Sequence, residues 1–369
     1  MKRIMLLAAL ALLATAGAAR AESSLVGLMQ AWWSYTAYED TLPAVDEDAT
    51  QTGFGLRRAR AGWSYKQGDL GGLVVGEVTG DRVYVLEAYG DWKVNELLGL
   101  RAGRFGGVGS QAGCLTSSAK LDLIDVNLVG SRWSSATVGS DGRTIGAQLN
   151  LTPNEVFSLR VLAHNGTGNW NLDFTPSNSS HGDPTAVDED DEPAPTMVDT
   201  GALPQLDFGV YANPTPALAV GFTYGLPHEF RQTTGSLTAF VYYTAPRSFL
   251  KFDYATLMHN PVWDENDADY TSLGYSLTAG YGLTKKAELV GRYETWDEDT
   301  DVDYDTEDPG EADPSFVKNF ALGLNYYVNP EAKYDQVLKA AFTLRMDEMP
   351  EGVDIADPYL FQLMWQIYL

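Results

Sequence analysis

Five arginines stand alone or in pairs within stretches of the chain that are otherwise apolar, small or uncharged. They are Arg58, Arg60, Arg101, Arg160 and Arg292. In an extended strand, the neighbours of each arginine point to the opposite side, and here those neighbours are mostly apolar. An arginine or lysine facing lipid near mid-membrane costs about 2–4 kcal/mol. The pattern therefore predicts strands with one face in lipid and one charged face lining a water-filled pore, whose chemistry is non-covalent selection.

Catalysis requires side chains held in a fixed pair or triad, and the sequence offers no such set. The four histidines are His164, His181, His228 and His259, and no serine and aspartate pattern accompanies them. The single Cys114 excludes an intramolecular disulfide and a cysteine-based zinc site. We expect neither an enzyme nor a cofactor.

The acidic residues concentrate in two runs, at 188–192 and 297–305. The spacing of Asp299, Asp301 and Asp303 resembles the start of a calcium-binding EF-hand loop, but the turn glycine and the final glutamate are missing at the required places. Solvated loops that repel one another remain the alternative to a divalent-cation site. The formal net charge of −25 argues against nucleic acid as a partner.

Alternating stretches along the chain predict about 16 strands of roughly transmembrane length. The last, Tyr359–Leu369, places six apolar residues on one face and Gln362 and Gln366 on the other. A strand ending the chain needs a partner to cover its edge, and pairing with the first strand provides it. The predicted strands are Leu25–Ala37, Gly53–Tyr65, Leu70–Val78, Val83–Trp92, Leu97–Phe105, Arg143–Leu151, Glu155–His164, Gln205–Ala212, Ala217–Gly225, Ser236–Thr244, Phe249–Met258, Thr271–Leu283, Ala287–Trp296, Phe316–Val328, Lys333–Arg345 and Tyr359–Leu369.

Connections between these strands alternate in length. Those after even-numbered strands are short, and those after odd-numbered strands are long, with 79–82 as the exception. An outer-membrane barrel has short periplasmic turns at one rim and long extracellular loops at the other. The fold class predicted is all-β: a transmembrane antiparallel up-and-down barrel, with both termini in the periplasm. A soluble β-sandwich or β-solenoid explains the strands but not this asymmetry.

The same alternation assigns the charged strand residues to the lumen. Arg57 and Arg104 break the pattern, and both stand near strand ends, where snorkelling is expected. A narrow barrel plugged by ion pairs is the alternative to a pore. The luminal bases are Arg58, Arg60, Arg101, Arg160, Lys251, Arg292, Lys339 and Arg345, and the luminal acids are Glu77, Glu87, Asp91, Asp207, Asp253, Glu288 and Glu294.

The connection Gly106–Gly142 is the candidate for a constriction loop folded into the lumen. Lys120 and Arg132 are its candidate pore-lining bases, offset by Asp122 and Asp125. Its apolar residues, Leu121, Leu123, Ile124, Val126 and Leu128, are expected to pack on the inner wall. An external loop is the alternative.

Residues 1–21 have the pattern of a signal peptide. Lys2 and Arg3 precede the apolar run 4–16, and a small-x-small cleavage site ends at Ala21. An uncleaved anchor is the alternative. Residues 22–369 then form one barrel domain, and we expect export to the outer membrane of a Gram-negative-type bacterium.

Seven stretches resemble the phosphate-selective porin O/P family, in the family's order. They are Gly53–Arg60, Leu86–Trp92, Leu100–Phe105, Gly142–Leu149, His164–Gly166, Glu288–Tyr293 and Gly323–Asn329. The resemblance implies a homotrimeric channel of about 16 strands that passes anions along luminal arginines. Arg57, Arg58 and Arg60 match the family's basic run. The chain departs from the family in its nearly balanced luminal charge, and it ends on Leu369 where such barrels usually end on phenylalanine.

These observations predict a porin for small hydrophilic solutes and ions, anions such as phosphate among them, embedded in outer-membrane lipid. The alternative is a structural or sheath-type barrel that houses or docks a periplasmic partner.

Overall fold

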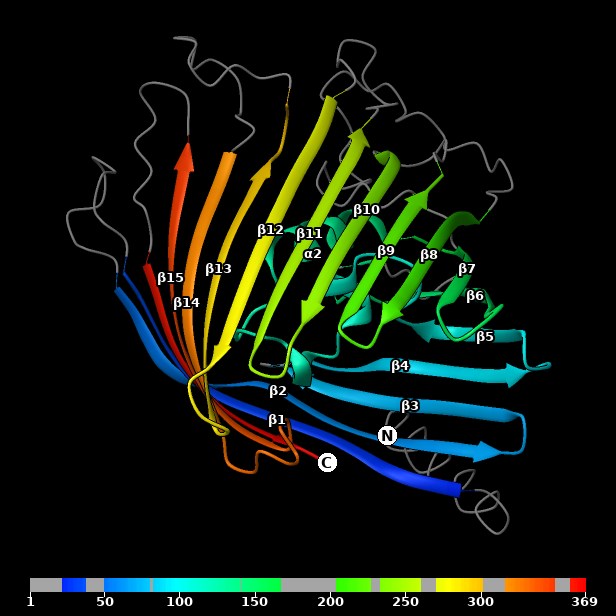
Figure 1. The fold of residues 1–369 in the computed structure, drawn as a ribbon, viewed down its shortest axis with the longest axis horizontal. Helices are drawn as coiled ribbons and strands as arrows, with labels where there is room; N and C mark the ends of the chain where they lie inside the picture. Colours follow the sequence, from blue (N-terminus) through cyan, green and yellow to red (C-terminus); the bar gives the residue numbers. More distant parts are fainter. Residues whose placement is uncertain are drawn as a thin grey trace, which may run out of the picture.

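The computed structural model describes residues 22–37, 50–79, 82–139, 141–166, 204–226, 233–259, 270–300, 316–348 and 359–369. These residues form a closed barrel of 16 strands, each paired antiparallel with its neighbours in the chain. The first and last strands pair with each other, so the sheet has no free edge (Figure 1). The predicted fold class is confirmed.

The strands fall within a few residues of the predicted ranges. They are β1 (Glu22–Ala37), β2 (Thr50–Gln67), β3 (Leu70–Thr79), β4 (Arg82–Lys93), β5 (Leu98–Phe105), β6 (Thr144–Leu151), β7 (Phe157–His164), β8 (Gln205–Thr215), β9 (Leu218–Gly225), β10 (Thr233–Thr244), β11 (Ser248–His259), β12 (Tyr270–Gly282), β13 (Ala287–Asp297), β14 (Phe316–Tyr327), β15 (Gln336–Glu348) and β16 (Tyr359–Tyr368). Three short helices lie between β5 and β6: η1 (Gln111–Leu115), η2 (Ser118–Lys120) and α2 (Leu128–Thr137). No helix among the described residues is long and apolar enough to cross a membrane.

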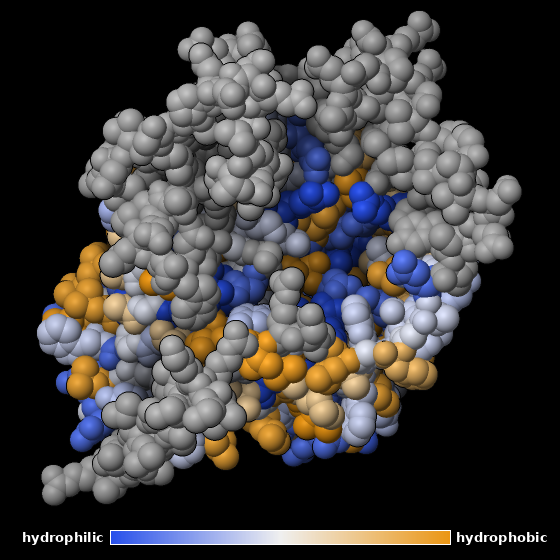
Figure 2. All heavy atoms as spheres, turned by 180° about the vertical axis from the view of Figure 1, so that it is seen from behind, coloured by the Kyte–Doolittle hydropathy of each residue, from blue (hydrophilic) through white to orange (hydrophobic). Residues whose placement is uncertain are grey.

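The two faces of the sheet differ as the sequence predicts. Paired Phe252 and Leu277 are 38% and 43% exposed, whereas the next pair, Asp253 and Ser276, is buried. The closing strand repeats the pattern, because Trp365 is exposed and Gln366 is buried. Figure 2 shows apolar side chains on the outer wall and hydrophilic ones gathered in a hollow. The charged face points inward.

Two β-bulges change the side to which particular residues point. Between β1 and β2, Gln30 pairs with Arg58 and Ala31 with Leu56, which leaves Arg57 as an extra residue. Arg57 therefore joins Arg58 on the inner side, so the expectation that it snorkels at a strand end is wrong. A second bulge, between Val75 and Gly76, has the same effect on Leu86 of β4.

Leu86 and Arg104 both differ from the sequence prediction. Leu86, expected to face lipid, is only 1% exposed, because the bulge turns it to the interior. Arg104, expected to snorkel, is buried and forms an ion pair with Asp141. Asp141 therefore provides the buried Arg104 with the charged partner that water would otherwise supply.

The connections at the rim that holds Leu369 are short, and the longest runs from 328 to 335. At the other rim, most of the predicted long loops lie outside the described residues, as do the run 188–192 and most of 297–305. The predicted signal peptide also lies outside them. The connection between β5 and β6 is described except for residue 140, and we call residues 106–142 the inner segment.

Candidate functional site

Two of the ion pairs that fix the inner segment to the barrel join it to widely separated strands. Asp122 accepts hydrogen bonds from Lys251 of β11 at 2.7 and 2.8 Å. Asp125 pairs with Arg57 of β2 at 2.5 Å. Strands β2 and β11 lie nearly opposite each other in the ring, so a segment that contacts both must cross the interior.

Backbone carbonyls of the segment are satisfied by side chains of the wall. Lys339 of β15 donates to the carbonyls of Leu121 and Leu123, at 2.5 and 3.2 Å. Gln366 of β16 donates to the carbonyl of Ala119 at 2.9 Å. These polar wall residues are buried beneath the segment, where each carbonyl without a partner would cost about 1–3 kcal/mol.

Apolar side chains of the segment pack on the same part of the wall. Ile124 contacts Trp32, Ala341 and Met364, and Leu123 contacts a second cluster around Val290. The predicted packing of Leu121, Leu123 and Ile124 on the inner wall is confirmed, since all three are buried.

Helix α2 presents its N-terminus to acidic residues of the wall. The Leu128 amide donates to Glu294 of β13 at 2.8 Å, and the Asn127 side chain donates to Asp253 of β11 at 2.9 Å. A helix N-terminus favours a carboxylate through its free amides and its dipole. Residues 118–128 of the segment therefore lie on the side of the lumen formed by β11–β16 and β1, whereas Gly109 is hydrogen-bonded to Tyr211 of β8 and Thr223 of β9.

Two cavities lie mainly along β2–β10, and Val26 and Leu28 of β1 and Tyr368 of β16 also line the larger one. The first has a volume of 580 Å³ and the second of 250 Å³. Residues of the short-turn half, such as Asn213 and Tyr368, line the first, whereas Thr79 and Asp141 of the other half line the second. The two cavities share only three lining residues, Arg60, Thr116 and Arg143. The two cavities therefore adjoin at these side chains.

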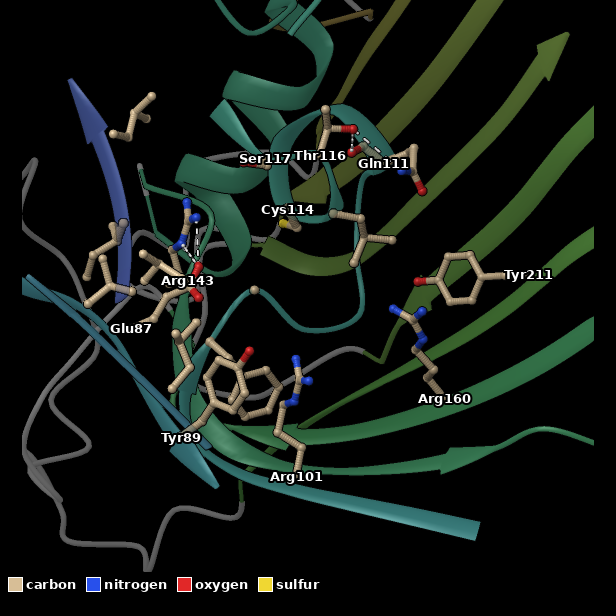
Figure 3. A pocket seen from close by; sticks show the side chains of 18 of the residues that line it. Glu87, Tyr89, Arg101, Gln111, Cys114, Thr116, Ser117, Arg143, Arg160 and Tyr211 are labelled. Carbon is tan, nitrogen blue, oxygen red and sulfur yellow. Dashed lines mark hydrogen bonds and ion pairs between the residues drawn. The ribbon is translucent and has the colours of Figure 1, made fainter. Parts of the chain in front are cut away.

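The arginines at this junction are held by carboxylates of neighbouring strands. Arg60 pairs with Glu77 of β3, which also accepts a hydrogen bond from Tyr84 at 2.6 Å. Arg143 donates from Nε and Nη2 to one oxygen of Glu87, at 3.0 and 2.9 Å (Figure 3). Fixed guanidinium planes give the junction a defined width and charge.

Arg58 and Arg160 line the cavities without an acidic partner. Arg58 lines the smaller cavity, and Arg160 lines the larger one. Neither forms an ion pair with any described residue. By contrast, every carboxylate that lines either cavity is in an ion pair: Glu77 with Arg60, Glu87 with Arg143, and Asp141 with Arg104. The accessible path therefore carries excess positive charge.

The structure distributes the predicted site residues over three places. Arg58, Arg60, Arg101 and Arg160 line the cavities. Arg57 and Arg292 lie behind the inner segment, where Arg292 donates to the carbonyl of Asp125 at 3.0 Å. Of the segment's own bases, Lys120 at the end of η2 is exposed, and Arg132 is half-buried and pairs with Glu298 at 2.7 Å.

Sequence reasoning missed Arg143 and Thr116 at the junction. Arg143 precedes β6 by one residue, so the alternation of a strand could not assign it a side. The feature of the sequence that could have identified Arg143 is its position directly after Gly142, a turn glycine with φ of 71°. Thr116 lies between the two short helices, and nothing in its neighbours distinguishes it.

Two titratable groups of the inner segment have shifted pKa values. Burial within the barrel would raise the pKa of Asp125, but Arg57 and a hydrogen bond from Gln362 hold it below its ordinary value. Asp125 is 41% exposed to the interior space, so solvent moderates this attraction. Burial raises the pKa of the Cys114 thiol to about 12.

The described residues contain no cluster of three or more His, Cys, Asp and Glu side chains that could hold a metal ion. His164 is fully buried, with Nε2 2.9 Å from Asp207, and it lines neither of the two cavities. This pair joins β7 to β8.

Several solved structures share the whole architecture. DcaP, an outer membrane channel of Acinetobacter baumannii, aligns with a TM-score of 0.62 and 12% identity, covering 96% of this chain and 99% of that one. OmpF of Salmonella typhi, solved with daunomycin, has a TM-score of 0.60 and 14% identity over 94% and 98% of the two chains. OmpT of Vibrio cholerae, an outer-membrane protein, has a TM-score of 0.57 and 12% identity over 95% and 98%.

The chain has a porin-like barrel fold. At these identities the likeness extends to the fold and to nothing finer. No protein-family model matches the sequence. No curated protein matches it either.

Proposed function

We propose that the chain forms an outer-membrane diffusion channel for small hydrophilic solutes and ions, with the inner segment as its constriction. The observation that carries this proposal is the meeting of the two cavities at Arg60, Thr116 and Arg143. A segment fixed to one side of the lumen leaves a path along the other, and its width and charge decide what passes.

We infer a preference for anions. The luminal charges listed from the sequence were nearly balanced, but the inner segment covers many of them, including Lys251, Asp253 and Glu294. The groups that still face the path include two unpaired arginines, Arg58 and Arg160, and no unpaired described carboxylate. Phosphate is one anion that such a lining would admit.

The dimensions of the interior disfavour a sheath that houses a protein. The cavities of 580 and 250 Å³ have the size of small-molecule sites. A periplasmic carrier would need the inner segment to leave the lumen, which would expose the buried polar wall residues that satisfy its carbonyls. A barrel that only docks a partner at its rim would still contain the path.

Location and assembly follow from the same reasoning. A band of exposed apolar side chains around a closed barrel requires lipid, and residues 1–21 have the pattern of an export signal. We infer insertion in the outer membrane with the short turns in the periplasm. One similar structure, OmpT of Vibrio cholerae, is described in a trimer form, and we infer a homotrimer for this chain.

Reconstitution in planar bilayers tests the proposal. Purified full-length protein should produce discrete conductance steps in KCl, and a salt gradient should give a reversal potential of the sign that anions produce. Absence of steps would refute the channel, whereas a cation-type reversal potential would refute only the preference for anions.

A further inference from the structure

Arg160 lies over an aromatic ring on the wall of the larger cavity. Its guanidinium carbon lies 4.6 Å from the centroid of the Tyr211 ring. Gly209, paired with Arg160 across the strands, makes this possible, because a Cβ there would lie 2.7 Å from the ring of Tyr211. Figure 3 shows the two side chains next to each other at the edge of the open space. This cation–π contact helps to hold the guanidinium in place, and its N–H donors have no partner among the described residues.

Arg101, two strands away, is supported in the same manner but is already paired. Its guanidinium carbon lies 4.1 Å from the Tyr89 ring centroid, and Asp91 accepts two hydrogen bonds from it at 2.7 and 2.9 Å. Since Asp91 neutralises Arg101, and Glu77 and Glu87 neutralise the junction arginines, the cavity has one uncompensated positive charge, at Arg160.

The rest of the cavity is partly apolar. Val75, Leu86, Leu115 and Phe240 contribute to its lining together with the two tyrosines. Leu86 reaches the cavity only because of the bulge in β4. A channel wall that serves inorganic ions alone has no need of such side chains, because a hydrated ion gains nothing from apolar contact.

We propose that this cavity is a binding site for small monocarboxylates with a flat apolar body, with Arg160 binding the carboxylate. The planar fork of an arginine fits a carboxylate with two parallel hydrogen bonds, and one net positive charge matches one negative charge. The apolar lining then distinguishes benzoate from acetate, and the single charge disfavours divalent phosphate. This inference rests on the proposed channel function and specifies its solute class.

Block of the ion current measures this binding. Benzoate, added to the reconstituted full-length channel, should reduce its KCl conductance at concentrations at which acetate and phosphate have little effect. Arg160→Gln should weaken the block by about tenfold, as expected for loss of a charged hydrogen-bonding partner. Arg160→Lys keeps the charge without the fork and should weaken the block less.

Lys93→Gln is the matched control, because it removes one positive charge from the exposed end of β4, outside both cavities. Its block by benzoate should equal that of the wild type. Equal block in Arg160→Gln and the wild type would overturn the site, and stronger block by phosphate or acetate than by benzoate would overturn the solute class. In both cases the KCl conductance itself would remain, so the channel function would stand; loss of all conductance in the wild type would refute the channel instead.

Discussion

Arg57 and Arg58 are neighbours in the sequence, and a single β-bulge gives them different tasks. Without the bulge, one of them would face lipid. With it, Arg57 binds Asp125 of the inner segment, while Arg58 lines the smaller cavity without an acidic partner among the described residues. The two adjacent arginines of this basic run therefore have different roles. Arg57 attaches the inner segment to the wall, and Arg58 contributes positive charge to the cavity.

Replacing Arg58 should weaken the preference for anions. Arg58→Gln removes the unpaired positive charge of the smaller cavity, so the ratio of anion to cation permeability should fall severalfold. Reversal potentials in a KCl gradient measure this ratio. Lys285→Gln, in an exposed short turn, is the control and should leave it unchanged. An unchanged ratio in Arg58→Gln would exclude a role for this charge in selection.

Cys114 should be unreactive in the folded barrel. The thiol is buried and its pKa is raised to about 12, so very little thiolate exists at neutral pH. Maleimide at pH 7 should label it only after denaturation, as mass spectrometry would show. Rapid labelling of the native protein would mean that η1 is not packed as the structure describes.

The sequence predicted the side of most charged residues because a strand alternates with period two. It failed where the backbone leaves that period. The bulges beside Arg57 and Leu86 depend on pairing with β1 and β3, which no local pattern records. The pairing of Arg104 with Asp141 was missed as well, because Asp141 lies far along the connection between β5 and β6, and no local pattern records the contact.

At the scale of elements, the inner segment keeps its shape through a close crossing of η1 and α2. A Cβ on Gly113 would lie 2.2 Å from Oγ of Ser134 and 2.3 Å from the carbonyl oxygen of Gly130. These are distances that only glycine permits, so the two helices share a contact that fixes the position of Thr116 at the junction.

Gly113→Ala should therefore separate the two helices and destabilise the segment by about 1–3 kcal/mol, the usual cost of overpacking. Gly291→Ala is the control, because a Cβ there meets nothing within 4 Å. Unfolding in urea, followed by tryptophan fluorescence, compares the two. If both variants unfold at the same urea concentration, the close crossing does not exist.

The ion pair between Asp125 and Arg57 should make the attachment of the inner segment to the barrel wall dependent on pH. The pKa of Asp125 is held below its ordinary value of about 3.9, so the ion pair contributes stability above that pH and loses it as the pH falls through the lowered pKa. Asp125→Asn should raise the conductance and its noise at pH 7. Because the pKa is lowered, this difference from the wild type should persist at a pH of about 3.9, the ordinary value, and vanish only as the pH falls further through the lowered pKa. A difference that has already vanished at a pH of about 3.9 would contradict the sign of the shift.

The sequence predicted that 106–142 packs its leucines inside, from length and composition alone. It could not predict which wall the segment occupies. That choice depends on partners far apart in the chain, such as Asp122 with Lys251 and Gln366 with the carbonyl of Ala119. The same partners determine which luminal charges are covered and which face the path.

At the scale of the whole molecule, the pairing of β1 with β16 closes the barrel around a lumen. The inner segment can then be held against one side of this lumen and leave a pore along the other. The buried glutamines Gln30 and Gln366 are hydrogen-bonded to each other at 2.8 Å across this seam, and both also donate to carbonyls of the inner segment. Gln30 and Gln366 thus stabilise both the position of the inner segment and the closure of the barrel.

We expect the protein to form a homotrimer, and the molecular mass of the purified protein tests this expectation. Light scattering of the protein in detergent, corrected for bound detergent, should give three times the chain mass of the exported form. A monomer mass in several mild detergents would contradict the homotrimer while leaving the pore of each chain intact.

We propose that each barrel contains a continuous aqueous path bounded by the inner segment and the arginines of β2–β7. Single-channel recording of the purified protein in a planar bilayer is the most direct measurement of such a path. We expect discrete, reproducible conductance steps in KCl that become larger in Asp125→Asn, because the segment is then less firmly held. Correctly folded protein that inserts and gives no steps would contradict it.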